Sequence, residues 1–115
     1  LVVTAGKGFV ASRMEGTSAG VMSHMAVGTS TTAAAAGQTA LVSESARVAL
    51  ASTSVSSAVV TYTATFPAGT GTAALTEAGI LNASSGGTML CRTVFSVVNK
   101  GSADAMTITW TVTVS

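Results

Sequence analysis

Ala105–Ser115 reads A-M-T-I-T-W-T-V-T-V-S, with an apolar residue at every second position and threonine between them. Successive side chains of a β-strand point to opposite faces, so this alternation predicts a strand with one apolar face and one hydroxyl-bearing face. β-Branched residues suit such a half-buried surface. Trp110 belongs to the apolar row and is therefore expected to face the core.

Similar patterns occur upstream of this segment. Val59–Phe66 alternates apolar residues, Tyr62 among them, with threonines and is followed by Pro67, where a strand should stop. Leu75–Leu81 and Thr88–Val98 flank N-A-S-S-G-G, which predicts a hairpin. The strands expected from all such patterns are Val21–Val27, Ala46–Ser52, Val59–Phe66, Leu75–Leu81, Thr88–Val98 and Ala105–Val114.

One helix is expected, at Thr4–Gly16, with Thr4 as its cap. The residues that fit its amphipathic face are Phe9, Val10, Arg13 and Met14. Turns are expected at Ser52–Ser57 and Asn99–Ser102. Several closely spaced strands without strand–helix alternation predict a mainly β fold. We therefore expect one domain, residues 1–115, built as an antiparallel β-sandwich with one short N-terminal helix.

The composition is poor in charge. Hydrophobic residues make up 48% of the chain and charged residues 8%, with a formal net charge of +1, whereas roughly a quarter of an average soluble protein is charged. A low net charge favours association. We expect an oligomer or a larger assembly, with a homotrimer as the guess for the chain itself. The alternative is a Ser/Thr-rich β domain that hydroxyl groups keep soluble.

The basic residues are too dispersed for a nucleic-acid site, which needs clustered lysine or arginine. They are Lys7, Arg13, Arg47, Arg92 and Lys100. A membrane partner is not expected either. Residues 48–76 carry no charge, but serine, threonine, glycine and a proline interrupt them, which is unlike a membrane span.

The sequence contains few residues of the types that usually carry out catalysis. A Ser–His–Asp triad would need the single histidine, His24, with the single aspartate, Asp104, and no G-x-S-x-G marks a nucleophile. One histidine and one cysteine far apart do not form a zinc site. We expect no enzyme and no catalytic, cofactor-binding or metal-binding residue. Cys91, inside an expected strand, is interpreted as a small buried hydrophobe.

Two further features concern the expected sheets. Glu77 and Arg92 face each other across the predicted hairpin and could pair, which on a sheet surface contributes roughly 0.2–1 kcal/mol. The threonine rows of Val59–Phe66 and Ala105–Ser115 could order water, as in ice-binding proteins. Those proteins usually repeat the motif through the chain, so solvent-exposed threonine on amphipathic strands is the preferred interpretation.

Several short motifs follow one another along the chain. They are T-A-G-K at Thr4–Lys7, M-A-V-G-T at Met25–Thr29, T-A-L-V-S-E at Thr39–Glu44, R-V-A-L at Arg47–Leu50, V-V-T-Y at Val59–Tyr62, T-E-A-G-I-L at Thr76–Leu81 and G-T-M-L-C-R at Gly87–Arg92. Their order resembles the tail-fibre and collar attachment domains of tailed bacteriophages, which run T-x-A-G-K … I-A-V-G-[DT]-G and later [TR]-E-[AIV]-G-[IL]-[FL].

The resemblance implies a non-enzymatic virion protein that docks on other virion subunits. No shaft or receptor-binding segment follows the motifs within these residues, so we expect a capsid decoration, or cement, protein bound to the major capsid protein. A tail-fibre, collar or baseplate attachment protein is the alternative. The second alternative, a carbohydrate- or receptor-binding module, would need exposed aromatic residues. The candidate contact loops are Gly28–Gly37, Pro67–Thr72 and Ser84–Gly87.

Overall fold

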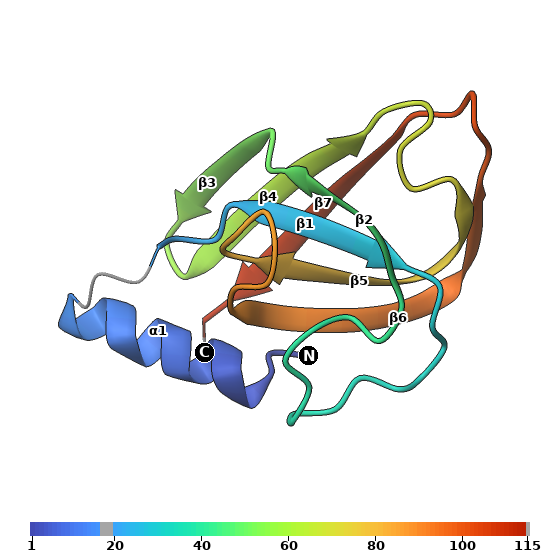
Figure 1. Ribbon diagram of the computed structural model, residues 1–115. Helices are drawn as coiled ribbons and strands as arrows, with labels where there is room; N and C mark the ends of the chain where they lie inside the picture. The colour runs from blue at the N-terminus through green and yellow to red at the C-terminus, as the bar shows by residue number, and fades with distance from the viewer. Residues whose placement is uncertain (17–19, 115) are drawn as a thin grey trace.

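The computed structural model describes residues 1–16 and 20–114, and these form an antiparallel β-sandwich with one N-terminal helix (Figure 1). The fold class predicted from the alternating segments is therefore confirmed. The elements are α1 (Thr4–Glu15), β1 (His24–Gly28), β2 (Glu44–Ala49), β3 (Ser52–Ser56), β4 (Val59–Phe66), β5 (Ala73–Leu81), β6 (Met89–Lys100) and β7 (Met106–Thr113).

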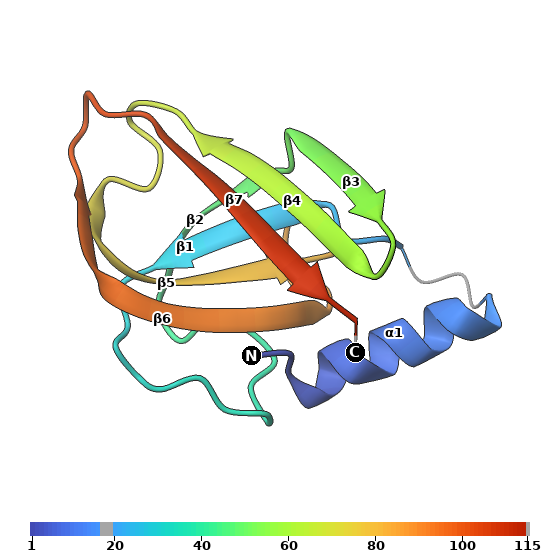
Figure 2. The ribbon, with the colours of Figure 1, turned by 180° about the vertical axis from the view of Figure 1, so that it is seen from behind.

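Two sheets make up the sandwich. The four-stranded sheet has the order β2-β1-β5-β6 and the three-stranded sheet the order β3-β4-β7, with every neighbouring pair antiparallel. The chain passes between the sheets at residues 50–51, 67–72 and 101–105. Seen from behind, β7 runs diagonally across the molecule, with β4 along one edge (Figure 2).

The register of β4 and β7 places like residues side by side. Tyr62 lies opposite Trp110, and Thr63 lies opposite Thr109. The apolar rows of both strands pack toward the core and the threonine rows face outward, as the alternation predicts. Tyr62 and Trp110 do face the core, but both are only half-buried.

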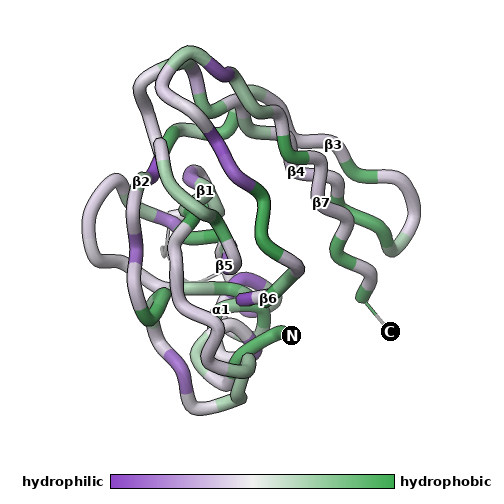
Figure 3. Tube along the Cα trace, turned by 90° about the vertical axis from the view of Figure 1, so that its right-hand side faces the viewer, coloured by the Kyte–Doolittle hydropathy of each residue, from purple (hydrophilic) through white to green (hydrophobic). Residues whose placement is uncertain are grey.

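The main core lies between the sheets. Its most deeply buried large residues include Met25, Phe66, Leu75 and Ile80. A second, smaller cluster holds Leu41, Leu81 and Met89 together with Val3 and Ala26. It forms where residues 1–5 and the loop 29–43 cover the far side of the four-stranded sheet. Figure 3 shows the two sheets close together at one end and diverging toward the C-terminus. In Figure 1 the 67–72 and 101–105 connections lie together at one end of the molecule.

The turn predicted at Ser52–Ser57 is wrong, because most of it is strand β3. The run S-T-S-V-S has no apolar periodicity, and all five residues of β3 are exposed. Its extended conformation comes from pairing with β4, in which Val55 lies opposite Val60. The turn shrinks to Ser57–Ala58, and Ser57 adopts a positive φ of 54°.

The helix also differs from the prediction in how it begins and packs. Val3 is the N-cap and no side chain caps the helix, so Thr4 is its first residue rather than its cap. Met14, expected on the apolar face, is 84% exposed. Phe9 and Val10 do pack against the main core, as expected, and the helix approaches β6 at Gly6, where any Cβ would collide with the carbonyl of Leu90. At 12 residues α1 is short, and the described residues contain no helix long and apolar enough to cross a membrane.

Smaller boundary shifts affect every strand predicted from the sequence except β4. β5 begins at Ala73 instead of Leu75, and β7 runs from Met106 to Thr113 instead of from Ala105 to Val114. β1 begins at His24 instead of Val21, and β2 ends at Ala49 instead of running to Ser52. β6 extends to Lys100, so the last turn begins after Lys100 and not at Asn99, where it was expected.

Candidate functional site

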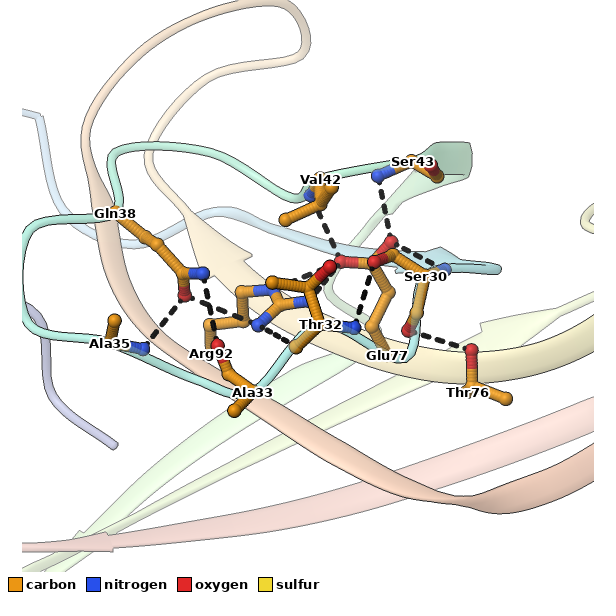
Figure 4. Close-up of polar contacts among 10 residues, drawn as sticks. All are labelled: Ser30, Thr32, Ala33, Ala35, Gln38, Val42, Ser43, Thr76, Glu77 and Arg92. Carbon is orange, nitrogen blue, oxygen red and sulfur yellow. Dashed lines mark hydrogen bonds and ion pairs between the residues drawn. The ribbon is translucent and has the colours of Figure 1, made fainter.

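Glu77 of β5 forms the centre of a buried polar cluster on the far side of the four-stranded sheet (Figure 4). Its Oε1 accepts hydrogen bonds from Arg92 Nε at 2.9 Å and from the Val42 amide at 3.0 Å. Its Oε2 accepts from the amides of Ser30 at 3.0 Å and Ser43 at 2.8 Å. The side chains of Glu77 and Arg92 are both 0% exposed. We call Glu77, Arg92 and their partners in residues 30–43 the clasp.

Arg92 completes the clasp from β6. Its Nη1 donates to the Thr32 carbonyl at 2.9 Å and to Gln38 Oε1 at 3.2 Å. Its Nη2 lies 2.9 Å from Glu77 Oε1 as an ion pair, although no N–H of that nitrogen is well directed at an acceptor. Gln38 in turn binds Ala33 and Ala35 within the loop. The clasp therefore holds the loop 29–43 against the sheet.

The predicted pairing of Glu77 with Arg92 is confirmed, but its setting on a sheet surface is wrong. Register irregularities in β5 place Glu77 opposite Val94 and Gly79 opposite Arg92, so the two charges meet diagonally. The loop then folds over them and excludes water. A buried pair of this kind behaves differently from a surface pair, because removing one partner leaves an uncompensated charge in a low-dielectric interior.

The environment of Glu77 fixes its charge. Burial alone would raise its pKa, but the hydrogen bonds from Ser43, Ser30, Val42 and Arg92 together hold the pKa below its ordinary value. Each of its two oxygens already accepts two hydrogen bonds, so the carboxylate is poorly placed to accept a proton from another molecule. Gly28 permits this packing, because a Cβ there would collide with the Ser43 carbonyl and the Glu77 carboxylate. The clasp is thus structural.

A second polar contact ties the two sheets together at one end. Lys100, at the end of β6, is 4% exposed. Its Nζ donates to the Pro67 carbonyl at 2.9 Å and to the carbonyl of Asp104, and Asp104 Oδ2 accepts from the Gly101 amide at 2.9 Å. The Lys100 ammonium group therefore donates a hydrogen bond to each of the two connections between the sheets, 67–72 and 101–105.

At the open side of the sandwich, β6 and β7 flank a groove of about 580 Å³. Its apolar lining includes Phe95 and Val98 from β6 with Met106, Ile108 and Trp110 from β7. Thr93 and Ser96 of β6 and Thr109 and Thr111 at the edge of β7 also border the groove, and none of its lining residues is charged. Phe95, Ile108 and Trp110 remain half-buried. An uncharged, partly exposed groove between two strand edges can bind apolar or hydroxyl-bearing groups of a partner.

Charge is distributed unequally between the two sheets. Residues 48–76 and 105–115 contain no charged residue, so β3, β4 and β7 are wholly neutral. The charged residues lie in α1, in the four-stranded sheet and in the turn before β7; they are Lys7, Arg13, Glu15, Glu44, Arg47, Glu77, Arg92, Lys100 and Asp104. The three-stranded sheet is therefore the surface that a protein partner can cover without desolvating charge.

The residues considered for catalysis lie apart. His24, whose Nδ1 is 2.7 Å from Ser23 Oγ, pairs with Leu81 at one end of β5. Asp104 follows Lys100, which pairs with Ala73 at the other end of β5. The described residues hold no group of three histidine, cysteine or acidic side chains that could bind a metal. That the chain is not an enzyme stays a prediction.

Cys91 is buried in the main core, as expected for a small hydrophobe. Burial raises the pKa of its thiol to about 11. A thiol of that kind is protonated at neutral pH and a poor nucleophile.

The three predicted contact loops do not gather at one site. Gly28 belongs to β1, and residues 29–37 are part of the loop that the clasp holds. Pro67–Thr72 precedes β5 and Ser84–Gly87 follows it, so the nine residues of that strand separate them. The groove was missed because its strands were expected to face a closed core. The alternation of the C-terminal strand shows that one of its faces is apolar but does not show whether the opposite sheet covers that face.

Comparison with models of protein families, with curated proteins and with solved structures finds no match to this chain. The resemblance to phage attachment domains therefore stays a prediction from the motifs. Four of those motifs meet at the clasp, because they supply Gly28, Ser43, Glu77 and Arg92. These four motifs are thus brought into contact by the fold.

Proposed function

We propose that this chain is a non-enzymatic structural protein of a bacteriophage virion, which docks on other virion subunits and decorates the capsid as a cement protein. The phage context rests on the motif order. The docking role rests on one observation: the three-stranded sheet, with its outward-facing threonine rows, carries no charged residue. Covering hydroxyl groups costs less hydration than covering charged groups, and hydrogen bonds to the partner can offset that cost.

A tail-fibre, collar or baseplate attachment protein is the second candidate, because the motifs themselves resemble tail and collar domains. Both candidates use the same docking surface. They differ in how many copies one particle carries, since a decoration repeats over the capsid lattice and a tail adaptor does not.

The test is the copy number of this chain in purified particles of the phage that encodes it, measured by quantitative mass spectrometry against the major capsid protein. Copies comparable in number to the capsid protein support the decoration role. A ratio typical of tail proteins moves the chain to the tail or collar. Absence from the particle contradicts the virion proposal.

A further inference from the structure

β7 has an edge without the usual protection against pairing. It pairs with β4 on one side only, and that register runs without a shift over eight residues. The strand contains no charge and no proline. Natural edge strands normally carry charged side chains, proline or bulges, or are very short. An edge of about 27 Å, at roughly 3.4 Å per residue, is therefore open to another strand.

The other sheet edges are better protected. β6 is covered at its start, where Val2 bridges Cys91 and the backbone of Leu1 exchanges hydrogen bonds with Arg92. Residues 93–99 of β6 also lack charge and proline, but their pairing with β5 is irregular between Val94 and Val98. β2 carries the Glu44–Arg47 ion pair and a register irregularity. β3 has five residues only. The unprotected long edge and the apolar groove thus coincide at β7.

We propose that two copies of the chain associate about a twofold axis, with their β7 strands paired antiparallel and their apolar rows closing the groove. Directly opposed residues of an antiparallel pair share one face of the sheet. The partner's row of Met106, Ile108, Trp110 and Val112 therefore falls beside the same row of the first copy, on the groove side, and threonine falls beside threonine on the outer side.

The charge distribution favours a second copy as the occupant. A twofold interface brings identical surfaces together, so any charge near the axis would oppose itself. β7 and the lining of the groove carry none. Lys7 of α1 lines a second pocket with Val112–Val114, at the end of β7 and not beside Thr109 or Trp110. A copy of the chain also supplies a strand of matching length and alternation in every case. Because this pairing is a property of the chain alone, it does not depend on the virion proposal.

Face matching limits the register. Opposed residues must both belong to the apolar row or both to the threonine row, so the axis passes through a residue and not between two. Nearly complete overlap of β7 leaves two choices. With the axis at Thr109, Thr109 faces itself. With the axis at Trp110, Thr109 faces Thr111 of the second copy.

The test uses the double variant T109K/T111K, which places lysine opposite lysine in either register. Like charges directly opposite each other destabilise a strand pair. The control is T61K/T63K, because Thr61 and Thr63 are the β4 neighbours of Thr111 and Thr109 on the same outer face. The control carries the same added charge on a central strand, away from the β7 edge.

Light scattering coupled to size-exclusion chromatography gives the mass of each variant over a range of concentrations. We expect the wild type and the control at twice the 11.2 kDa chain mass and T109K/T111K at half the wild-type mass. T109E/T111E should also be monomeric alone, and an equimolar mixture with T109K/T111K should return to the doubled mass. Circular dichroism checks that each variant is folded.

Three outcomes would overturn the pairing. The first is a wild-type monomer at all concentrations, including one whose groove binds an oligosaccharide on a glycan array. The second is a trimer, as guessed from composition. The third is a T109K/T111K protein that stays dimeric or an acidic–basic mixture that does not associate. Presence or absence of the chain in phage particles bears on the proposed function and leaves this result unchanged.

Discussion

The two sheets of this sandwich differ in what stabilises them and in what they leave open. The four-stranded sheet is covered on both faces, by the core on one and by residues 1–5 and 29–43 on the other, and the buried Glu77–Arg92 clasp holds that cover in place. The three-stranded sheet has no charge, one solvent-facing threonine surface and an open edge at β7.

Within this small domain, one sheet contributes most of the buried polar interactions that stabilise the fold, and the other has the surface open to a partner. Polar interactions that specify the fold are concentrated where water is excluded, and each has several partners. The sheet that lacks such interactions exposes backbone groups and half-buried aromatic side chains. Changes to the first sheet should therefore affect folding, and changes to the second should affect association.

The largest effect is expected from Glu77→Gln. The carbonyl oxygen of the glutamine amide still accepts, but its NH2 group cannot, so two of the four hydrogen bonds to the side chain are lost. Arg92 also stays buried without its counter-ion, so the free energy of unfolding should fall by about 3–5 kcal/mol. Urea unfolding measures it. Glu44→Gln is the control, because the Glu44–Arg47 pair is partly exposed and its loss should cost less than about 1 kcal/mol. Equal losses for both variants would contradict the special role of the clasp.

Acidification should act on the same group. The pKa of Glu77 is lowered in the folded protein, so its contribution to stability is complete above the unfolded-state pKa, near 4.3, and is lost as the pH falls through the lower folded-state pKa. Urea midpoints between neutral and strongly acidic pH measure this. The decline should be shallower in Glu77→Gln. Parallel curves for the two proteins would mean that Glu77 does not titrate as described.

A smaller effect is expected where the sheets join. Lys100→Met keeps an unbranched side chain but removes the donors to the Pro67 and Asp104 carbonyls. We expect a loss of about 1–3 kcal/mol in the free energy of unfolding, since buried carbonyls are left without partners. Hydrogen exchange should increase at residues 67–72 and 101–105. Unchanged exchange at both connections would show that Lys100 does not join them.

The smallest effect comes from one substitution made on each sheet. Thr76→Val removes a hydrogen bond of 2.8 Å to the Ser30 carbonyl and should cost about 1 kcal/mol. Thr63→Val, on the outer face of the three-stranded sheet, should stay within about 0.5 kcal/mol of the wild type. Thermal unfolding of the two variants side by side checks this. A larger loss for Thr63→Val would reverse the contrast between the sheets.

The strands with strong alternation could be predicted from sequence alone. The bounds of β4 match the prediction, and β7 follows the row from Met106 onward. β3 could not be predicted, because its small polar residues are extended only through pairing with β4. The packing of α1 was predicted in part: Phe9 and Val10 do pack against the main core, whereas Met14 is exposed. The close approach of Gly6 to β6 was not predicted, because no apolar periodicity indicates it.

The ion pair of the clasp could be predicted from the sequence, but its burial could not. A glutamate and an arginine within apolar strands indicate a pair, since such residues are rarely buried without a partner. That the pair is sealed from water depends on a loop some 35–60 positions away in sequence, which local patterns do not reveal. The groove was not predictable, because it arises from the angle at which the two sheets diverge.

We infer that the three-stranded sheet contacts a protein partner, whereas the four-stranded sheet does not. Hydrogen exchange of the chain, compared between dilute and concentrated solution, tests it directly. We predict that amides of β7 become more protected as the concentration rises, while those of β2 and of the loop 29–43 do not change. Protection that rises at β2 or the loop, or nowhere, would contradict the claim.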